Sequence, residues 1–349
     1  MAAKIPIQNI YYLLCYAWNS LAEGEVTDVS GIDSNELADL FATVLINGVN
    51  HTLRRGLDRC YEPHEEELSS IRGRIDIAMT TRRMLAAQGR ACCHFDEFTV
   101  NTMPNRIIKS TLRFLASVPT IDKKLKGKLL KLYRSLHEVD DVPLNKFLFQ
   151  KIQLNSNNRF YRFLLNICEM VLSSWLIDEQ SGKYKFKDFI RNDKAMARLY
   201  ESFMLNFYKM ELKGSKVKKE EIKWNATSET DPLLKHLPSM RTDISIRDKD
   251  RTLIIDAKYY SKTLQSYYDK ESIHSGNLYQ ILAYLDNLKS EGGNDAKAEG
   301  MLVYPVIEKK LRETYSMNGR KIHICTLDLS QDWRDIRSEL LELVKYSLG

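Results

Sequence analysis

Three charged residues in the C-terminal half have the types and spacing of a metal-assisted hydrolytic site. Asp243 begins one expected strand, and Asp256 and Lys258 directly follow the apolar run 253–255 at the end of the next strand. Side chains two residues apart on a strand point to the same face, so Asp256 and Lys258 should share a face. A carboxylate and an ammonium directly after a buried run are costly to bury without a purpose.

The chemistry that this set suits is phosphodiester hydrolysis. Two carboxylates that meet across neighbouring strands repel each other unless a cation lies between them, and hard oxygen ligands suit Mg²⁺. Mg²⁺ would polarise the scissile phosphoryl group and lower the pKa of a bound water, and Lys258 would hold or activate that water. We expect Asp243, Asp256 and the backbone carbonyl of Ala257 to be ligands.

Other residues are weaker candidates, and each has a structural alternative. An Asp-x-Lys sequence alone is common, and the alternative is a surface hairpin whose Asp and Lys pair in solvent. Gln280, on a following helix, would orient Lys258, water or a DNA phosphate, whereas Tyr284 is expected to pack. Glu201, on a preceding helix, is either an extra metal-site acid or a solvated residue of an amphipathic helix.

The elements that must position these residues form a mixed α/β sheet with helices on its faces. Hydrophobic periodicity predicts helices over 195–212, 277–288 and 333–348, and strands over 222–226, 240–247, 252–259, 300–304 and 322–329.

The N-terminal half is expected to be a separate α+β domain. Predicted helices over 5–20, 34–53, 105–118, 122–136 and 155–176 surround a small β element between 54 and 99. We place the domains at 1–162 and 163–349, since 349 residues are too many for one ordinary domain.

Composition and charge exclude some classes and leave others open. A formal charge of +6 permits nucleic-acid binding without arguing strongly for it. No apolar run reaches the length of a membrane span and no signal peptide is evident. The six cysteines form no CxxC pair, so we expect reduced thiols in a cytoplasmic protein. The compact run 92–94, Cys-Cys-His, cannot make a tetrahedral zinc site without distant partners.

Basic residues offer candidate contacts for DNA or a protein partner. Arg72 and Arg74, on the small β element, are candidates for reaching into a partner, and the alternative is surface ion pairing. Two lysine clusters are candidate phosphate-binding or partner-binding faces, although such faces are usually only solvated; they comprise Lys213, Lys216, Lys218, Lys219 and Lys223, and Lys123, Lys124, Lys126, Lys128 and Lys131.

Two resemblances extend this interpretation. The pattern Asp243…Asp256-x-Lys258 followed by Gln280 resembles the PD-(D/E)xK nuclease core, a restriction-endonuclease-like fold. Four further segments resemble the McrC family, the nuclease subunits of McrBC modification-dependent restriction systems, and the similarity runs over nearly the whole chain; the segments are 5–18, 71–75, 105–109 and 256–260.

The second resemblance implies a partner and a substrate. Such subunits cut double-stranded DNA that carries modified cytosine, such as 5-methylcytosine, together with McrB, an AAA+ motor that hydrolyses GTP. Their N-terminal part docks into the motor ring and stimulates its GTPase. This sequence has no G-x-x-x-x-G-K-[ST] motif, so a motor must be another chain. One site per chain implies two copies for double-strand cleavage. The alternatives are a catalytically silent scaffold that activates the motor, and a stand-alone DNA repair nuclease.

Overall fold

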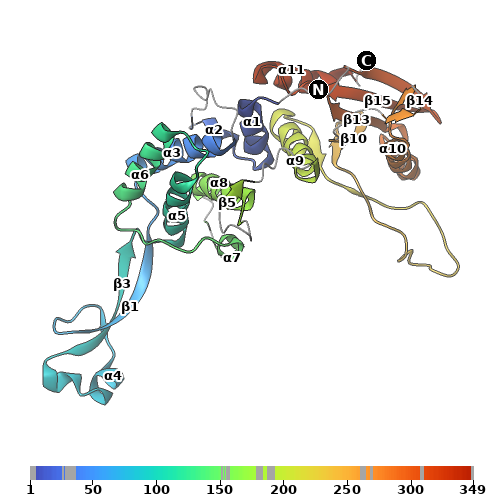
Figure 1. Ribbon diagram of the computed structural model, residues 1–349. Coiled ribbons are helices and arrows are strands. Elements are labelled where there is room, and N and C mark those ends of the chain that lie inside the picture. Colours follow the sequence, from blue (N-terminus) through green and yellow to red (C-terminus); the bar gives the residue numbers. More distant parts are fainter. Residues whose placement is uncertain are drawn as a thin grey trace. The chain divides into compact units, whose positions relative to one another are not determined.

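The computed structural model describes residues 5–25, 27, 37–150, 152, 154, 158–177, 184–186, 193–259, 265–267, 270–306 and 310–346. The chain folds into two compact units (Figure 1). The nuclease unit, named here for the sequence prediction, comprises Met1–Glu25, Ser30–Leu37 and Lys187–Gly349, and the inserted unit comprises Val26–Val29 and Ala38–Phe186.

The nuclease unit is built on a six-stranded mixed sheet. Strand β10 lies inside it, antiparallel to β9 and parallel to β13, and β13 is parallel to β15. In spatial order the strands are β14 (Arg312–Met317), β15 (Arg320–Leu327), β13 (Glu299–Pro305), β10 (Thr252–Ala257), β9 (Ile244–Arg247) and β6 (Lys216–Lys218). The mixed sheet and its flanking helices agree with the predicted fold class.

Helices, 3-10 turns and two separate strand pairs complete the nuclease unit. Its helices are α1 (Ile7–Ala17), α2 (Leu21–Glu25), α9 (Asp193–Glu211), α10 (Ser275–Leu288) and α11 (Trp333–Tyr346), with 3-10 turns η4 (Lys289–Glu291) and η5 (Asp295–Lys297). Two further strand pairs are β7 (Glu221–Ile222) with β8 (Met240–Arg241), and β11 (Gln265–Tyr267) with β12 (Lys270–Ser272).

Helix α10 covers one face of this sheet. Ile281 and Leu285 of α10 pack in one buried cluster with Ile254 of β10 and Leu302 of β13. Side chains alternate along a strand, so Ile255 points to the opposite face, where α9 and α11 contact the sheet. Tyr208 of α9 donates a hydrogen bond of 3.0 Å to the Leu340 carbonyl of α11, which ties these two helices together.

The N-terminal helix α1 belongs to the nuclease unit. Tyr16 packs edge-on against Phe203 of α9, and Tyr12 stacks on Trp333 of α11 with ring centroids 4.8 Å apart. Asn9 donates a hydrogen bond of 2.8 Å to the Leu329 carbonyl. The structure thus divides the chain differently from the sequence prediction: the boundary placed between 162 and 163 falls inside α8, and the N-terminal segment packs on C-terminal helices through its apolar face.

The inserted unit is mainly helical, as expected, and carries a small sheet. Its helices are α3 (Leu37–Arg55), α4 (Ile77–Arg82), α5 (Met103–Ser117), α6 (Lys123–Ser135), α7 (Lys146–Gln150) and α8 (Arg159–Ser174), with the 3-10 turn η1 (Leu85–Gln88). Its strands are β1 (Cys60–Leu68), β2 (Arg74–Ile75) and β3 (Ala91–Thr99), and the pair β4 (Trp175–Ile177) with β5 (Tyr184–Phe186). None of the described helices is long and apolar enough to cross a membrane.

A buried polar centre joins the small sheet to the helices of the inserted unit. Asn105, at the start of α5, donates hydrogen bonds to the carbonyls of Val100 at 2.7 Å and Asp58 at 2.9 Å. Tyr161 of α8 donates to the Asn105 side chain at 2.8 Å. Buried polar groups are stable only when they are hydrogen-bonded. These contacts therefore fix the backbone just before β1 and just after β3, where the small sheet joins the helices.

Gly73 allows the segment before β2 to pass close to the backbone of β3. Its φ of +68° lies in the left-handed region, and a Cβ at this position would lie 2.3 Å from the His94 carbonyl oxygen. Only glycine meets both demands without displacing the backbone. The pairing of β2 with β3 therefore depends on this residue.

Candidate active site

Asp256 lies at the carboxyl end of β10 and is fully buried. All residues of this strand are buried, as the apolar run predicted. Lys258 Nζ forms an ion pair with Asp256 Oδ2 at 2.8 Å, whereas Oδ1 of the same carboxylate has no hydrogen-bond partner among the described residues. Buried carboxylates are normally paired and hydrogen-bonded, so Asp256 presents acceptor capacity that the protein itself leaves unfilled.

Asp243 is placed beside Asp256 by the register of the hairpin. Ile244 of β9 pairs with Ile255 of β10, so the next residues outward, Asp243 and Asp256, lie across from one another. Asp243 Oδ2 accepts a hydrogen bond of 3.0 Å from the Ala257 backbone N–H. The structure therefore brings the two predicted carboxylates together.

Crowding of negative charge changes the acidity of Asp243. Burial, followed by the charges of Asp256 and Glu201, raises the pKa of Asp243 from 3.8 to about 7, although Lys258 opposes this change. Glu201 of α9 therefore lies close enough to act on the pair. Its carboxylate forms an ion pair with Lys219. Glu201 is therefore an ion-paired residue whose charge reaches Asp243, and its role as a metal-site acid stays a prediction.

Lys258 is held between the sheet and α10. Its backbone N–H donates to the Val303 carbonyl at 3.0 Å, which extends the pairing of β10 with β13. Its Nζ donates a hydrogen bond of 3.0 Å to Gln280 Oε1. Gln280 Nε2 in turn donates to the Tyr284 hydroxyl at 2.7 Å, and that hydroxyl donates to the Arg241 carbonyl at 2.9 Å. Tyr284 thus links the helix to the segment before Asp243, a role beyond the packing that we expected.

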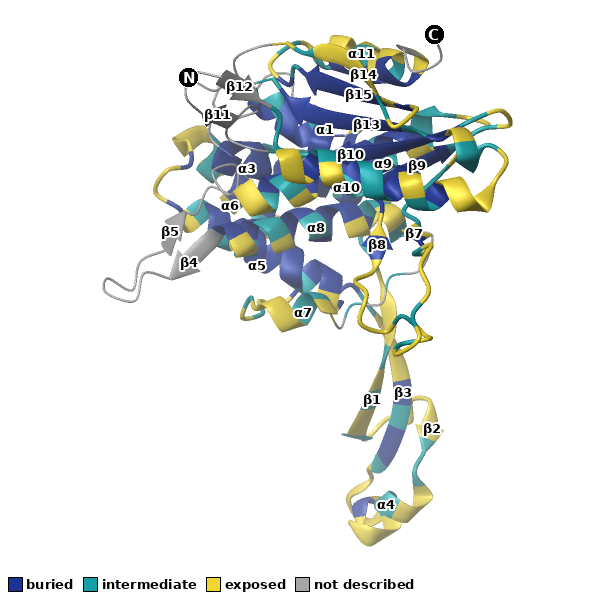
Figure 2. Cartoon of the chain, turned by 90° about the vertical axis from the view of Figure 1, so that its right-hand side faces the viewer, coloured by how far each residue is buried: buried dark blue, intermediate teal, exposed yellow. Residues whose placement is uncertain are grey.

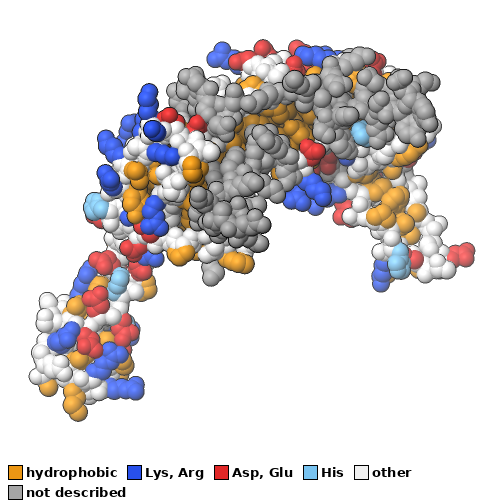
Figure 3. Space-filling model, in the orientation of Figure 1, with side chains coloured by type: hydrophobic (Ala, Val, Ile, Leu, Met, Phe, Trp, Pro, Cys, Tyr) orange, Lys and Arg blue, Asp and Glu red, His pale blue; other side chains and the backbone are white. Residues whose placement is uncertain are grey.

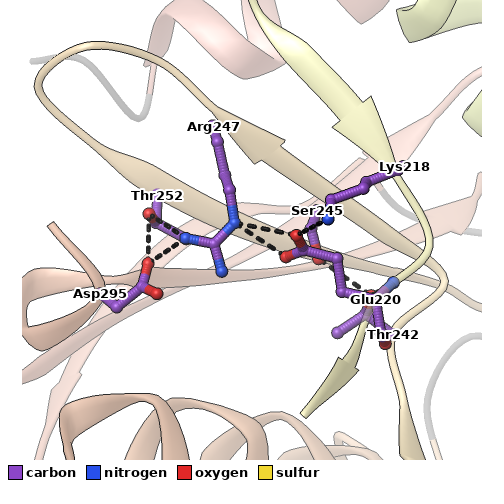
Figure 4. Close-up of polar contacts among 7 residues, drawn as sticks. All are labelled: Lys218, Glu220, Thr242, Ser245, Arg247, Thr252 and Asp295. Atoms are coloured by element: carbon purple, nitrogen blue, oxygen red, sulfur yellow. Dashed lines mark hydrogen bonds and ion pairs between the residues drawn. The ribbon is translucent and has the colours of Figure 1, made fainter. Parts of the chain in front are cut away.

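A polar network braces the segment that carries Asp243 (Figure 4). The backbone N–H of Thr242 donates to the Glu220 carbonyl at 2.9 Å, and the Glu220 N–H donates to Thr242 Oγ1 at 3.0 Å. The Glu220 carboxylate accepts hydrogen bonds of 2.8 and 3.0 Å from Arg247 Nε. Arg247 also pairs with Asp295, which accepts a hydrogen bond of 2.7 Å from Thr252. Sequence inspection missed Glu220, since an acid among lysines carries no distinctive signal.

The donor set fits a divalent cation bound by oxygen. Asp243 and Asp256 lie side by side, Asp256 Oδ1 has no hydrogen-bond partner in the part of the chain that the structure describes, and the charge of Glu201 reaches Asp243. Two neighbouring buried carboxylates are stable together only when a proton or a cation offsets their repulsion. Asp243, Asp256 and the Ala257 carbonyl, with Glu201 nearby, would hold Mg²⁺, which favours such oxygen ligands.

The basic residues singled out from the sequence differ in their surroundings. Lys218 pairs with Glu220 at 2.8 Å and Lys219 pairs with Glu201, so these two neutralise acids near the site. The guanidinium carbon of Arg72 lies 4.1 Å from the centre of the Phe95 ring, on the small sheet. Figure 3 shows Lys and Arg side chains gathered over α6, in agreement with a solvated or partner-facing helix.

Comparison with known proteins places the chain in a family. Residues 8–305 match the family described as McrBC 5-methylcytosine restriction system component. The chain is 37% identical over 339 residues to the type IV methyl-directed restriction enzyme EcoKMcrBC of Escherichia coli (strain K12), covering 97% of each.

A solved structure supports the fold. The chain resembles a chain in a refined half-complex from a tetradecameric assembly of Thermococcus gammatolerans McrB AAA+ hexamers with bound McrC. The TM-score is 0.61 at 14% identity, and the match covers 97% of this chain and 76% of that chain. With a family match over most of its length and a relative aligned almost end to end, this chain belongs to the McrBC 5-methylcytosine restriction system component family.

Proposed function

We propose that this chain is the nuclease subunit of a McrBC-type restriction complex and hydrolyses DNA phosphodiesters with Mg²⁺. The observation that carries the proposal is the convergence of Asp243, Asp256, Lys258 and Gln280 at the end of β10, where the buried Asp256 is paired with Lys258 through Oδ2 and its Oδ1 has no donor among the described residues. A structural salt bridge alone would not need the second, partly protonated carboxyl group of Asp243 beside it.

The residues of this site have separable tasks. When bound, Mg²⁺ would polarise the scissile phosphoryl group and lower the pKa of its water. Lys258 Nζ would hold the attacking water and neutralise charge on the phosphate. Gln280 accepts a hydrogen bond from Lys258, so it would fix the direction in which the ammonium points. Asp243 and Asp256 would supply the negative charge that attracts the cation and keep it at the sheet edge.

The proposed partner is a GTP-hydrolysing AAA+ ring. The relative from Escherichia coli is named a methyl-directed enzyme, and the Thermococcus gammatolerans assembly contains McrB AAA+ hexamers with bound McrC. The present sequence contains no P-loop motif. We therefore assign motor activity and recognition of modified cytosine to a partner chain, and docking and GTPase stimulation to the inserted unit. Each chain has one site, so double-strand cleavage would require two copies.

The test is cleavage of methylated and unmethylated plasmid with Mg²⁺, with and without the partner motor and GTP. Cleavage should require all of these components and methylation. Lys258→Ala should slow cleavage at least about a hundredfold, because a positioned proton-transfer or charge-neutralising group contributes that much. The matched control is Lys249→Ala, an exposed lysine in the turn of the same hairpin, which should leave cleavage unchanged.

The same experiment separates the alternatives. If Lys258→Ala leaves cleavage intact, the proposed site is wrong. Cleavage by the chain alone, without motor or GTP, would indicate an autonomous nuclease. Stimulated GTP hydrolysis without cleavage under any condition would indicate a scaffold that only activates the motor.

A further inference from the structure

The small sheet of the inserted unit has little apolar core of its own. Figure 2 shows that α4 and much of β1 are exposed, whereas burial is concentrated on β3. Several of its large apolar side chains face solvent, including Ile71, Ile77 and Met84. Structural elements that bury so little apolar surface usually need another source of stability, such as a disulfide or a bound metal.

A cluster of potential metal ligands lies on one face of this sheet. The donor atoms of Glu65, Cys92 and His94 all lie within 4.8 Å of one another. The strand register explains the arrangement, because Glu65 of β1 is paired directly with His94 of β3. Cys92 is two residues before His94, so its side chain points to the same face. From the sequence alone, the run 92–94 had no distant residue to complete a metal site. The pairing of β1 with β3 supplies Glu65 as that residue.

Asp76 holds this cluster in place. Its backbone N–H donates to the Cys92 carbonyl at 2.8 Å, which fixes the start of α4 against β3. One carboxylate oxygen accepts from the Met79 N–H at 2.9 Å and caps α4. The other lies 3.3 Å from His94 Nε2 and orients the imidazole ring. Carboxylates that orient a metal-binding histidine in this way are a regular feature of zinc sites.

We propose that Glu65, Cys92 and His94 bind a Zn²⁺ ion that braces the small sheet, with Asp76 as a positioning residue. Thiolate, imidazole and carboxylate together suit zinc, and three protein donors leave one position for water. The Cys92 thiol donates a long hydrogen bond of 3.5 Å to Glu65 Oε1. On binding, the thiol proton would pass to solvent and the thiolate would bond to the metal.

The cluster also has an entry path. Cys92 is buried, but Glu65 is exposed and the His94 side chain is 40% exposed, so a hydrated ion can reach the donors from solvent. The competing explanation is that hydrogen bonds alone brace the sheet. The two explanations differ in one respect that can be measured, since only the zinc site forms a metal–thiolate bond.

Co²⁺ titration of the full-length, reduced chain tests the proposal. Co²⁺ replaces Zn²⁺ and gives a thiolate-to-metal charge-transfer band in the near ultraviolet only when sulfur is a ligand. Of the residues proposed to hold Mg²⁺ in the nuclease unit, none is a cysteine, so Co²⁺ bound there gives no such band. We expect the band to saturate at one Co²⁺ per chain and to disappear when Zn²⁺ is added.

Three variants make the result specific. Cys92→Ser should abolish the band, whereas Cys60→Ser, which removes an exposed thiol from the same sheet, should leave it unchanged. His94→Gln keeps the thiol and should weaken Co²⁺ binding at least about tenfold, which tests the site even if Cys92→Ser fails to fold. Absence of the band in the unmodified chain would overturn the proposal, as would a band that persists in Cys92→Ser.

Discussion

Replacing Asp243 by asparagine should stabilise the metal-free protein above pH 7 while removing cleavage. The pKa of Asp243 is raised because burial and the charges of Asp256 and Glu201 disfavour its ionised form. Asparagine has nearly the same shape and no charge. Its side-chain oxygen can still accept the hydrogen bond that the Ala257 N–H donates to Asp243. The substitution therefore removes mainly the electrostatic penalty.

The magnitude follows from the two pKa values. One pKa unit corresponds to about 1.36 kcal/mol, so a rise from 3.8 to about 7 gives an upper limit of roughly 4 kcal/mol. Well below pH 3.8 the carboxyl is protonated in both folded and unfolded chains, and no penalty exists. As pH rises from about 4 to 7, the unfolded chain releases its proton first, and the folded state loses stability relative to it. Above pH 7 the penalty is constant.

Thermal unfolding in EDTA at pH 5 and pH 8 measures this effect. For a unit of this size, in which 1 kcal/mol shifts the melting temperature by roughly 2–4 °C, Asp243→Asn should raise it by up to about 8–16 °C at pH 8 and by less than half of that at pH 5. Saturating Mg²⁺ should shrink the difference, because it stabilises only the charged site. Asp250→Asn, in the exposed turn of the same hairpin, is the control and should show no such pH dependence. A gap that is the same at both pH values would refute the reasoning.

Three further substitutions test the fold and the positioning contacts. Gly300→Ala should destabilise the nuclease unit by about 1–3 kcal/mol in chemical denaturation, because its Cβ would lie 2.7 Å from Ile281 Cγ1, and an unchanged midpoint would contradict that packing. Gly73→Ala should reduce stimulation of partner GTP hydrolysis, since it displaces β2 by a clash with the His94 carbonyl and strain of about 1–3 kcal/mol; full stimulation would show that β2 is not needed. Tyr284→Phe should slow cleavage by up to about tenfold, because it removes the hydroxyl that accepts a hydrogen bond from Gln280 and donates one to the Arg241 carbonyl, and a rate equal to that of the unmodified chain would exclude a positioning role.

The arrangement of Asp243, Asp256 and Lys258 could be predicted from the sequence, because it depends on the geometry of one strand and one hairpin. Alternation along a strand places Asp256 and Lys258 on one face, and a short hairpin brings Asp243 across from Asp256. The helix that carries Gln280 follows on the same face of the sheet. The bracing contacts of Glu220 were not accessible, because they depend on side-chain directions in a segment without periodic pattern.

Strand β14 is one of the strands that the sequence analysis missed, although the signal of its turn was present. Strand β14 pairs antiparallel with β15, and the two are joined at Asn318 and Gly319. Their φ values of 53° and 73° are those of a tight hairpin turn, for which Asn-Gly is the favoured pair. All residues of β14 except Met317 are exposed and most are polar, so hydrophobic alternation gave no indication of an edge strand.

The place of α1 could not be predicted, because it rests on contacts between the two ends of the chain. Ile10, Leu13 and Leu14 are fully buried, and burying each contributes about 1.5–3 kcal/mol, so α1 is an integral part of the nuclease unit. Beyond α2 the chain contributes Val26–Val29 and Ala38–Phe186 to the inserted unit, and it returns to the nuclease unit at Lys187, before α9. The inserted unit is therefore covalently tied at both ends to elements of the nuclease unit, and one of these, α9, carries Glu201.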